Sequence, residues 1–407
     1  MILLIFLSLD TLQISLDQAI EIGLRRRLEI KETDQSVKEA RVDLYDALSD
    51  LLPTPSSYYE IRRTEDFLDT TTHTWNLTLS QTIFNTATIY SIVNRFDRLS
   101  LAKVKFKEQI SKTIYNITET YIRLIISLVT QKNLRLSWER AKENYRFARA
   151  RYEVGLVSKL DLLQAEIAEI NTRKNIIDNT NLIEELEDHL QSLLDTNSYI
   201  IPTDTLTIPE PDQSLVQMRE EFASKNLLIQ AARINHSIAK KDLIFSYLAL
   251  LPSVSGFLSY SYRSYDSPGS ISEIWENKYR SYGLRIDFPI LNIKDILFGI
   301  VHSSIRKKQS EIKMRITEKE EVEVFQQAIR TIESSLAAIE LNRKSVEASK
   351  EALRLAQERY RNGKGSLLSL LTAQSDLQLS ENNYTNALGE YYLAMAKVAY
   401  LVGKGAE

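Results

Sequence analysis

The segment ARARYEVGLVSKLDLLQA (residues 148–165) decides the fold, because its pattern returns as AQERYRNGKGSLLSLLTA (residues 356–373). The shared residues keep the spacing Ala-x-x-Arg-Tyr-x-x-Gly-x-x-Ser-x-Leu-x-Leu-Leu-x-Ala at an offset of 208 residues. Other features repeat at a similar distance: Leu-Leu-Pro occurs at 51–53 and 250–252, and residues 83–85 (IFN) return as 290–292 (ILN). Self-similarity at a fixed long period indicates an internal duplication.

Each copy of the segment predicts a tight turn between two helices. Gly155 and Gly363 can each end a helix in the left-handed conformation at low steric cost. Ser158 and Ser366 can cap the next helix, and Asp161 lies near its positive end. A plain helical hairpin would explain one copy, but the same signature at both turns indicates that the two tips share a role.

The scarcity of turn residues predicts a few very long elements. The 407 residues contain only 8 Pro and 11 Gly, far below the average of roughly 5% and 7%. Neither residue occurs between Pro55 and Gly155, and Gly299 alone interrupts the span from Pro289 to Gly363. We therefore expect one helix over about residues 88–152, roughly 100 Å long at 1.5 Å per residue. Such a rod must pack against similar rods, from this chain or from copies of it.

The remaining segments alternate apolar and polar residues and predict four strands in two pairs, each pair following a Leu-Leu-Pro joint. One face of these strands is apolar and rich in aromatic residues, and the other is polar. This is the pattern of an outer-membrane barrel, with the apolar face outside. The smallest such barrels have eight strands, so four must be completed by copies of the chain. Two copies would give eight strands and three would give twelve; long helices around a lumen favour twelve. The expected exterior residues are Trp75, Leu77, Leu79, Leu258, Tyr260, Tyr262, Tyr282, Leu284, Ile286 and Phe288.

The chain thus divides into two structural repeats, 14–197 and 212–403, each with the order helix, strand, strand, long helix, turn, helix. Residues 198–211, which are rich in proline, form a linker between them. The apolar run MILLIFLSL lies within residues 1–13, which we interpret as a possible truncated signal segment.

Composition excludes several classes of function. The net charge of −3 offers no basic surplus for nucleic acid, and the absence of Cys removes thiolate chemistry. The four histidines lie at scattered positions without metal-ligand spacing, and no phosphate-binding loop or nucleophile elbow occurs. The paired acids at 184–185 and 320–321 fall on polar helix faces. We therefore predict no enzyme, no cofactor and no metal site.

The duplication, the element order, the Leu-Leu-Pro joints and the Arg-Tyr-x-x-Gly-x-x-Ser tips together resemble the TolC-like outer membrane efflux protein family over about residues 14–402. The fold class that the resemblance implies is mainly α with a small β part. Long antiparallel helical hairpins would form a trimeric α-barrel in the periplasm, and four strands per chain would contribute to a 12-stranded barrel in outer-membrane lipid. The implied function is that of an exit duct for a tripartite efflux pump or type I secretion, with a periplasmic adaptor (membrane fusion) protein and an inner-membrane transporter as partners.

The resemblance also assigns residues to the tips. The adaptor would dock on the periplasmic tips, at Arg151, Tyr152, Gly155, Leu156, Ser158, Arg359, Tyr360, Gly363 and Ser366. The entrance would be lined by Asp161, Gln164, Tyr360, Ser369 and Thr372. Where family members carry an Arg and two Asp residues at the gate, this chain has Gly365, Ser369 and Thr372, so we expect a less cation-selective entrance that is closed by weaker polar contacts.

A second hypothesis is a non-enzymatic coiled-coil scaffold, an interaction protein with a small β-sheet. The aromatic-rich alternating strands favour the duct, because a scaffold needs no apolar barrel exterior. The resemblance implies that the transported substrate, whether drug, metal or protein, would be chosen mainly by the inner-membrane partner.

Overall fold

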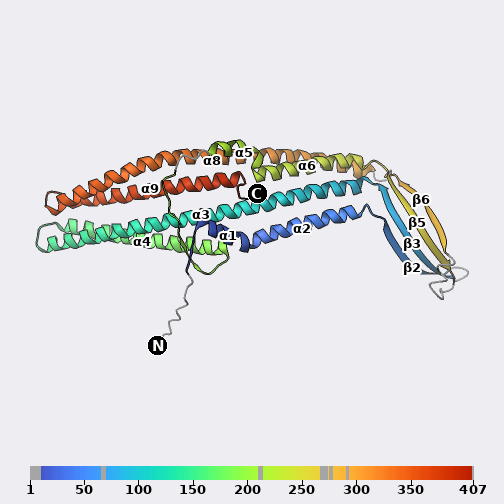
Figure 1. Ribbon diagram of the computed structural model, residues 1–407, viewed down its shortest axis with the longest axis horizontal. Helices are drawn as coiled ribbons and strands as arrows, with labels where there is room; N and C mark the ends of the chain where they lie inside the picture. The colour runs from blue at the N-terminus through green and yellow to red at the C-terminus, as the bar shows by residue number, and fades with distance from the viewer. Residues whose placement is uncertain are drawn as a thin grey trace, which may run out of the picture. The chain divides into compact units, whose positions relative to one another are not determined.

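Long helices account for most of the chain (Figure 1). The structure is a computed structural model that describes residues 11–65, 70–209, 214–265, 274, 278–289 and 293–405. The helices are α1 (Leu16–Arg26), α2 (Leu28–Ser49), α3 (Thr86–Glu153), α4 (Lys159–Leu194), α5 (Ser214–Lys225), α6 (Leu227–Leu248), α8 (Ile293–Arg361) and α9 (Leu367–Leu401). The strands are β1 (Thr11–Ile14), β2 (Thr54–Thr64), β3 (Thr70–Phe84), β4 (Tyr199–Pro202), β5 (Ser253–Ser264) and β6 (Tyr279–Asp287).

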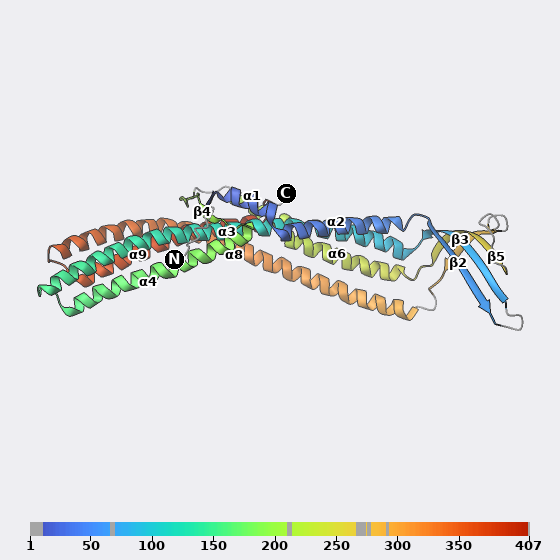
Figure 2. The ribbon, with the colours of Figure 1, turned by 90° about the horizontal axis from the view of Figure 1, so that it is seen from below.

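The two longest helices confirm the prediction drawn from missing breakers. Helix α3 has 68 residues and differs from the predicted span 88–152 by only one or two residues at each end. Helix α8 has 69 residues and contains Gly299 without a break. Each is followed by a tight turn and an antiparallel partner, α4 after α3 and α9 after α8 (Figure 2). The expected mainly α fold with four long strands is confirmed.

Two compact units share the chain. The tip unit comprises Met1–Lys31, Lys107–Leu227 and Lys319–Glu407, and the sheet unit comprises Glu32–Phe106 and Leu228–Glu318. Each unit takes segments from both sequence repeats, because every repeat runs from one unit into the other and back. The repeats 14–197 and 212–403 are therefore divisions of the sequence and not of space.

A short parallel pair of strands, β1 with β4, organises the core of the tip unit. Thr11 lies opposite Tyr199 and Ile14 opposite Pro202. Residues 11–13 had been assigned to a possible signal segment and residues 198–211 to a linker, but both ranges contribute a strand. Four-residue strands are too short to show a period of two, so the sequence did not predict them. Residues 1–9, the apolar run, lie outside the described residues.

Tyr121 connects this strand pair to α3. Its side chain is 1% exposed, and its hydroxyl lies 2.8 Å from the Ile14 carbonyl oxygen and 2.7 Å from Oδ2 of Asp204. The same Asp204 oxygen accepts a hydrogen bond of 2.7 Å from the Leu16 backbone N–H in the first turn of α1. A carboxylate at a helix N-terminus is electrostatically favourable. Tyr121 and Asp204 therefore fix the start of α1 against α3.

The helical segment that precedes the strands is interrupted in each half, which corrects the expectation of a single helix at that place in each repeat. The break between α1 and α2 falls at Arg27, whose backbone is extended (φ −56°, ψ 124°). The break between α5 and α6 falls at Asn226, which is 2% exposed. Arg27 Nη1 donates to the Ser192 carbonyl at 3.3 Å, and Asn226 Nδ2 donates to the Leu401 carbonyl at 3.0 Å. Neither break has a Gly or Pro, so no breaker signalled it.

Charged and polar contacts link helices of the sheet unit. Arg95 of α3 pairs with Asp43 of α2, and Lys241 of α6 binds both oxygens of Asp97 at 2.8 and 2.6 Å. The Tyr90 hydroxyl donates to Asp242 at 2.8 Å. The apolar content of the chain is therefore not gathered into a single globular core.

The four long strands form one antiparallel sheet in the order β2-β3-β5-β6. The two predicted pairs are present, and β3 also pairs with β5, which joins the two repeats. Both edges of the sheet, β2 and β6, have no further strand beside them among the described residues. Pro55 lies in edge strand β2, where a missing N–H is tolerated.

Candidate functional site

Both tips have the geometry that the repeated segment predicts. Gly155 and Gly363 have positive φ angles of 76° and 70°. At the first tip the Gly155 N–H donates to the Tyr152 carbonyl at 2.9 Å, and the next N–H reaches back to Arg151 at 2.8 Å. The second tip repeats both bonds, from Gly363 at 3.1 Å and from the residue after it at 2.8 Å. This pair of bonds is the Schellman motif, which satisfies the last carbonyls of a helix.

The helix that follows each tip is capped by the predicted serine. Ser158 Oγ accepts from the Asp161 N–H at 3.1 Å, and Asp161 Oδ2 accepts from the Ser158 N–H at 3.1 Å, which makes a complete capping box. Ser366 Oγ accepts from the Ser369 N–H at 3.1 Å, and the two hydroxyls are 2.8 Å apart. Asp161 and Ser369 therefore hold helix starts in this structure.

Arg151 connects the first hairpin to the second. Its guanidinium lies 4.7 Å from the ring centre of Phe147 on its own helix and 5.5 Å from that of Tyr360 on α8. The two guanidinium ends lie 3.5 Å from the carbonyl oxygens of Tyr360 and Arg361, at the C-terminal end of α8. A cation at a helix C-terminus is favoured by the helix dipole, and cation–π contact adds to this. Arg151 therefore bridges the hairpins within one chain.

Tyr360 is placed differently from its counterpart in the first tip. Tyr360 is 4% exposed, whereas Tyr152 is 39% exposed. Burial raises the pKa of the Tyr360 hydroxyl, the nearby Arg151 guanidinium opposes the shift, and the Asp161 carboxylate reinforces it. The hydroxyl has no hydrogen-bond partner among the described residues.

The other predicted tip residues lie mostly at the surface. Gln164 and Gly365 are half-buried. A Cβ added at Gly365 would lie 3.1 Å from the Tyr360 backbone nitrogen, so the arginine that family members carry there would be crowded. The exposed residues are Tyr152, Gly155, Leu156, Ser158, Arg359, Gly363, Ser366, Ser369 and Thr372.

Sequence reasoning missed a second link between the hairpins. Arg361 Nη2 lies 3.1 Å from Oε1 of Glu143, so an ion pair joins α8 to α3 close to Arg151. The Phe147 ring packs edge-on against Tyr360, with centres 5.7 Å apart. Arg, Glu and Phe are common on long helices, and no local spacing rule connects residues 218 positions apart. The sequence therefore carried no signal for this pairing.

One of the paired acids is also placed differently from the prediction. Glu184, Glu185 and Glu320 are exposed, as expected for a polar helix face. Glu321 is half-buried, and its Oε2 accepts a hydrogen bond of 3.0 Å from Asn226 at the break between α5 and α6. This glutamate supports the interrupted helix.

The register of the sheet places the predicted exterior residues on one face. Trp75 lies opposite Tyr262, Leu77 opposite Tyr260, and Leu258 between Leu79 and Tyr282. Directly opposed residues in a sheet point to the same side. The β6 members are the most exposed of the set, with Tyr282 at 80%. Tyr262 is an exception, because it is 3% exposed.

The opposite face of the sheet carries a polar network. Asn76 Nδ2 donates to Ser261 Oγ at 2.9 Å, and Thr78 Oγ1 donates to Asn76 Oδ1 at 2.6 Å. Thr78 Oγ1 and Ser259 Oγ are 3.1 Å apart. The sheet therefore has one apolar and one polar face, as the alternation predicts.

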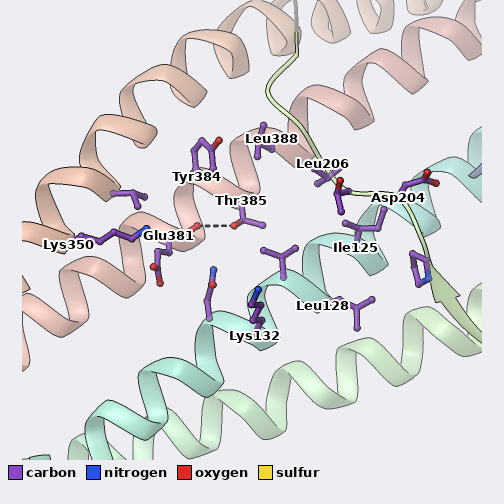
Figure 3. A pocket seen from close by; sticks show the side chains of 15 residues that line it. Ile125, Leu128, Lys132, Asp204, Leu206, Lys350, Glu381, Tyr384, Thr385 and Leu388 are labelled. Atoms are coloured by element: carbon purple, nitrogen blue, oxygen red, sulfur yellow. Dashed lines mark hydrogen bonds between the residues drawn. The ribbon is translucent and has the colours of Figure 1, made fainter. Parts of the chain in front are cut away.

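A pocket of about 480 Å³ lies in the tip unit between α3, α8, α9 and the segment after β4 (Figure 3). Its walls are mainly apolar, and four charged residues line it: Lys132, Lys350, Asp204 and Glu381. Asp204 is already occupied by the Leu16 N–H and the Tyr121 hydroxyl. Two lysines and two acids balance in charge, so the lining does not select a ligand of one sign.

The described residues contain no group of three or more His, Asp or Glu side chains placed to hold a metal ion. Among the described helices, none combines the length and the hydropathy that a transmembrane helix requires.

Comparison with known proteins identifies the family. The family model described as "Outer membrane efflux protein" matches residues 24–196 and 219–404, one range in each sequence repeat. The chain belongs to the outer membrane efflux protein family. No individually curated protein sequence matches it at a significant level.

Solved structures agree with this family assignment. VceC from Vibrio cholerae, an outer membrane protein, superposes with a TM-score of 0.86 at 15% identity and covers 96% of this chain and 97% of its own. The CmeC outer membrane channel of Campylobacter jejuni has a TM-score of 0.81 at 17% identity and covers 96% and 86%. The open-state MtrE channel of Neisseria gonorrhoeae has the same score and identity and covers 96% and 89%. These likenesses confirm the expected fold, and the family to which the chain belongs confirms the expected location in the outer membrane. The family members are channels and not enzymes.

Proposed function

We propose that this efflux protein is the exit duct of a tripartite efflux pump or type I secretion system. In this proposal three copies close around one lumen and conduct substrates passively from the periplasmic tips to the cell exterior. The supporting observation is the four-stranded sheet, whose edge strands have no further neighbour among the described residues and whose apolar face is exposed along β6. Open edges pair readily with other chains. Three sheets would give twelve strands, enough for a lumen.

The helices support assembly from copies. An apolar stripe along α4 is exposed in the single chain, although its spacing of three and four residues is that of a coiled coil. Another runs along the first half of α8. Stripes of this size normally mark protein contacts. The stripe residues are Leu160, Leu163, Ile167 and Ile170 of α4, and Leu297, Val301, Ile305, Ile312 and Ile316 of α8.

In this account the tips form the periplasmic entrance and the docking surface for the adaptor. The exposed residues Tyr152, Leu156 and Arg359 would contact the adaptor, and Arg151 would hold the two hairpins of one chain together. Ser369 and Thr372 replace the acidic residues of the family gate, so the entrance would be less cation-selective. Energy for transport would come from the inner-membrane transporter.

Two substitutions on β6 test the barrel. Leu284 lies on the apolar face and Ser281 on the polar face of the same exposed edge strand. A lysine near the middle of a lipid-facing strand costs about 2–4 kcal/mol, and each copy would add this cost. We expect Leu284→Lys to abolish assembly into the outer membrane and the pore conductance of the purified protein. Ser281→Lys, the matched control, should insert and conduct.

The scaffold hypothesis predicts the opposite result. If the sheet faced water, both lysines would be tolerated equally and neither protein would conduct ions in a planar bilayer. Equal behaviour of Leu284→Lys and Ser281→Lys would therefore contradict the duct.

A further inference from the structure

Another pocket of the tip unit, of about 400 Å³, lies between α3, α4 and α9 and has no charged side chain in its lining. Charged residues make up 26% of the chain, so an uncharged lining stands out on its long helices. The hydrogen-bonding groups in the pocket are amides and hydroxyls. They belong to Ser137 of α3, to Asn171 and Asn175 of α4, and to Gln374, Gln378 and Asn382 of α9. A charged ligand would lose its hydration here without gaining a counter-charge, so the pocket suits an uncharged molecule.

Two side-chain atoms of this pocket have no hydrogen-bond partner among the described residues. They are Nε2 of Gln374, which is a donor, and Oδ1 of Asn382, which is an acceptor. Gln374 is only 7% exposed, so its side chain is almost completely removed from bulk water. A buried polar group without a partner costs stability, and such groups are rare in native proteins. The two atoms therefore indicate a partner that both accepts and donates hydrogen bonds.

The pocket is open to the surface and extends along α9. Gln374 and Asn382 lie eight residues apart, which is about 12 Å along a helix axis. Ser137 is buried at the floor, whereas Asn171 and Asn175 on α4 are exposed. A ligand that reaches both unpartnered atoms must therefore be longer than a single sugar ring or a single amino acid.

We propose that this pocket binds a segment of a neutral oligosaccharide. Sugar hydroxyls both donate and accept hydrogen bonds, as the amide and hydroxyl side chains of the lining do. One ring can offer an acceptor to Gln374, and a later ring a donor to Asn382. An extended peptide offers fewer such groups, since its backbone carries one N–H and one C=O for each residue. Leu371 and Leu379 of the lining would lie against the C–H groups of the rings.

Saturation-transfer NMR on the purified full-length protein tests this site, because the method detects weakly bound ligands of large proteins. The detergent is lauryldimethylamine oxide, which has no sugar head group that would compete. The probes are chitotriose, a trimer of N-acetylglucosamine, and maltotriose, a trimer of glucose. We expect saturation transfer to at least one of them. Preference for chitotriose would assign the ligand to glycans of N-acetylated amino sugars, and preference for maltotriose would assign it to glucans.

Two substitutions remove the unpartnered atoms one at a time. Gln374→Leu and Asn382→Leu should each weaken the apparent affinity about fivefold, which is the equivalent of about 1 kcal/mol for one hydrogen bond. The thermal stability of each variant should equal or exceed that of the wild type, because an unsatisfied polar atom is lost. Since the two positions lie at different places along the pocket, the second variant decides the test if the first does not fold.

Asn386 provides the matched control, because it is exposed on α9 and lies outside the pocket. Asn386→Leu should bind the trisaccharides as the wild type does. No saturation transfer from the wild type to either trisaccharide would overturn the inference. Wild-type affinity in both Gln374→Leu and Asn382→Leu, or an equal loss in Asn386→Leu, would also overturn it.

A neutral peptide separates the saccharide from the other extended ligand. Binding of N-acetyl-tetraglycine amide in place of both trisaccharides would contradict the inference. The pocket lies within the tip unit of one chain, and the inference uses neither the sheet nor the conductance of a pore. Its failure would therefore leave the proposed duct untouched, and a protein that binds the saccharide without conducting would refute the duct alone.

Discussion

Arg151 is the residue whose contacts say most about the entrance, because its guanidinium lies against both an aromatic ring and the closing carbonyls of the other hairpin. Removing its charge should loosen the hairpins from each other. We expect Arg151→Gln to increase the conductance of the resting pore in a planar bilayer. Arg149 is the matched control, because it lies on the same helix but pairs only with Glu153, at 3.2 Å. Equal conductance of the Arg151→Gln and Arg149→Gln variants would contradict the bridging role.

Tyr121 makes the stability of the tip unit sensitive to alkaline pH. Burial is the main cause that raises its pKa to about 12, with hydrogen bonding to Asp204 next. In an unfolded chain the tyrosine hydroxyl has a pKa near 10. Its stabilising contribution is therefore complete below pH 10 and is lost as the pH rises through 12. Tyr115, in the same unit, also has a pKa raised to about 12, mainly by burial, and adds to the same loss.

Thermal unfolding, followed by the circular dichroism signal of the helices, measures how much of the alkaline loss of stability is due to Tyr121. At neutral pH Tyr121→Phe should be less stable than the wild type by about 1 kcal/mol, the value of a typical hydrogen bond. The difference between the two proteins should narrow between pH 10 and 12, because phenylalanine does not ionise. A difference that stays constant over this range would contradict the assignment.

The tip turns and the long helices use glycine in opposite ways. Gly155 has a φ of 76°, which costs an alanine roughly 1–2 kcal/mol. Gly299 lies inside α8 with open space around its Cα, where alanine is preferred by roughly 0.5–1 kcal/mol. We expect Gly155→Ala to speed amide hydrogen exchange at the first tip about tenfold.

Gly299→Ala is the control of opposite sign, because it should slow exchange in the surrounding turns of α8. A Gly155→Ala protein with unchanged protection at the tip would show that the positive φ is not required there.

At the scale of elements, the sequence predicted the long helices and the strands with a regular alternation. Long spans without Gly or Pro predicted α3 and α8, and strict alternation predicted the strands of the sheet. The same rules did not detect the four-residue strands β1 and β4, because a short run shows no period. They also did not predict the breaks at Arg27 and Asn226, where side chains reaching distant carbonyls interrupt a helix without a breaker residue.

At the tips, short-range sequence patterns were sufficient to predict the turns. Contacts between residues far apart in the chain left no such pattern. The glycines and capping serines follow from residues a few positions apart, so both turns were predicted. The contacts of Arg151 with α8 and of Glu143 with Arg361 join residues more than 200 positions apart in the chain, and nothing in a single sequence marks them. The carboxylate of Asp161 forms the capping box with Ser158, and its place at the entrance stays a prediction.

The whole molecule is best understood as one part of a larger assembly. The tip unit has its own buried cluster around Tyr121, and ion pairs such as Lys241–Asp97 link helices of the sheet unit. Within the described part of the chain, no further strand lies beside β2 or β6, and the apolar stripes on α4 and α8 are exposed. Copies of the chain arranged around an axis would cover all these surfaces at once.

The mass of the protein extracted from outer membranes tests this central claim most directly. Light scattering in detergent, corrected for bound detergent, gives the protein mass of the particle. We predict about 140 kDa, three times the 46.8 kDa of one chain, in the outer-membrane fraction. A particle of one chain that remains in the soluble fraction after export would contradict the account.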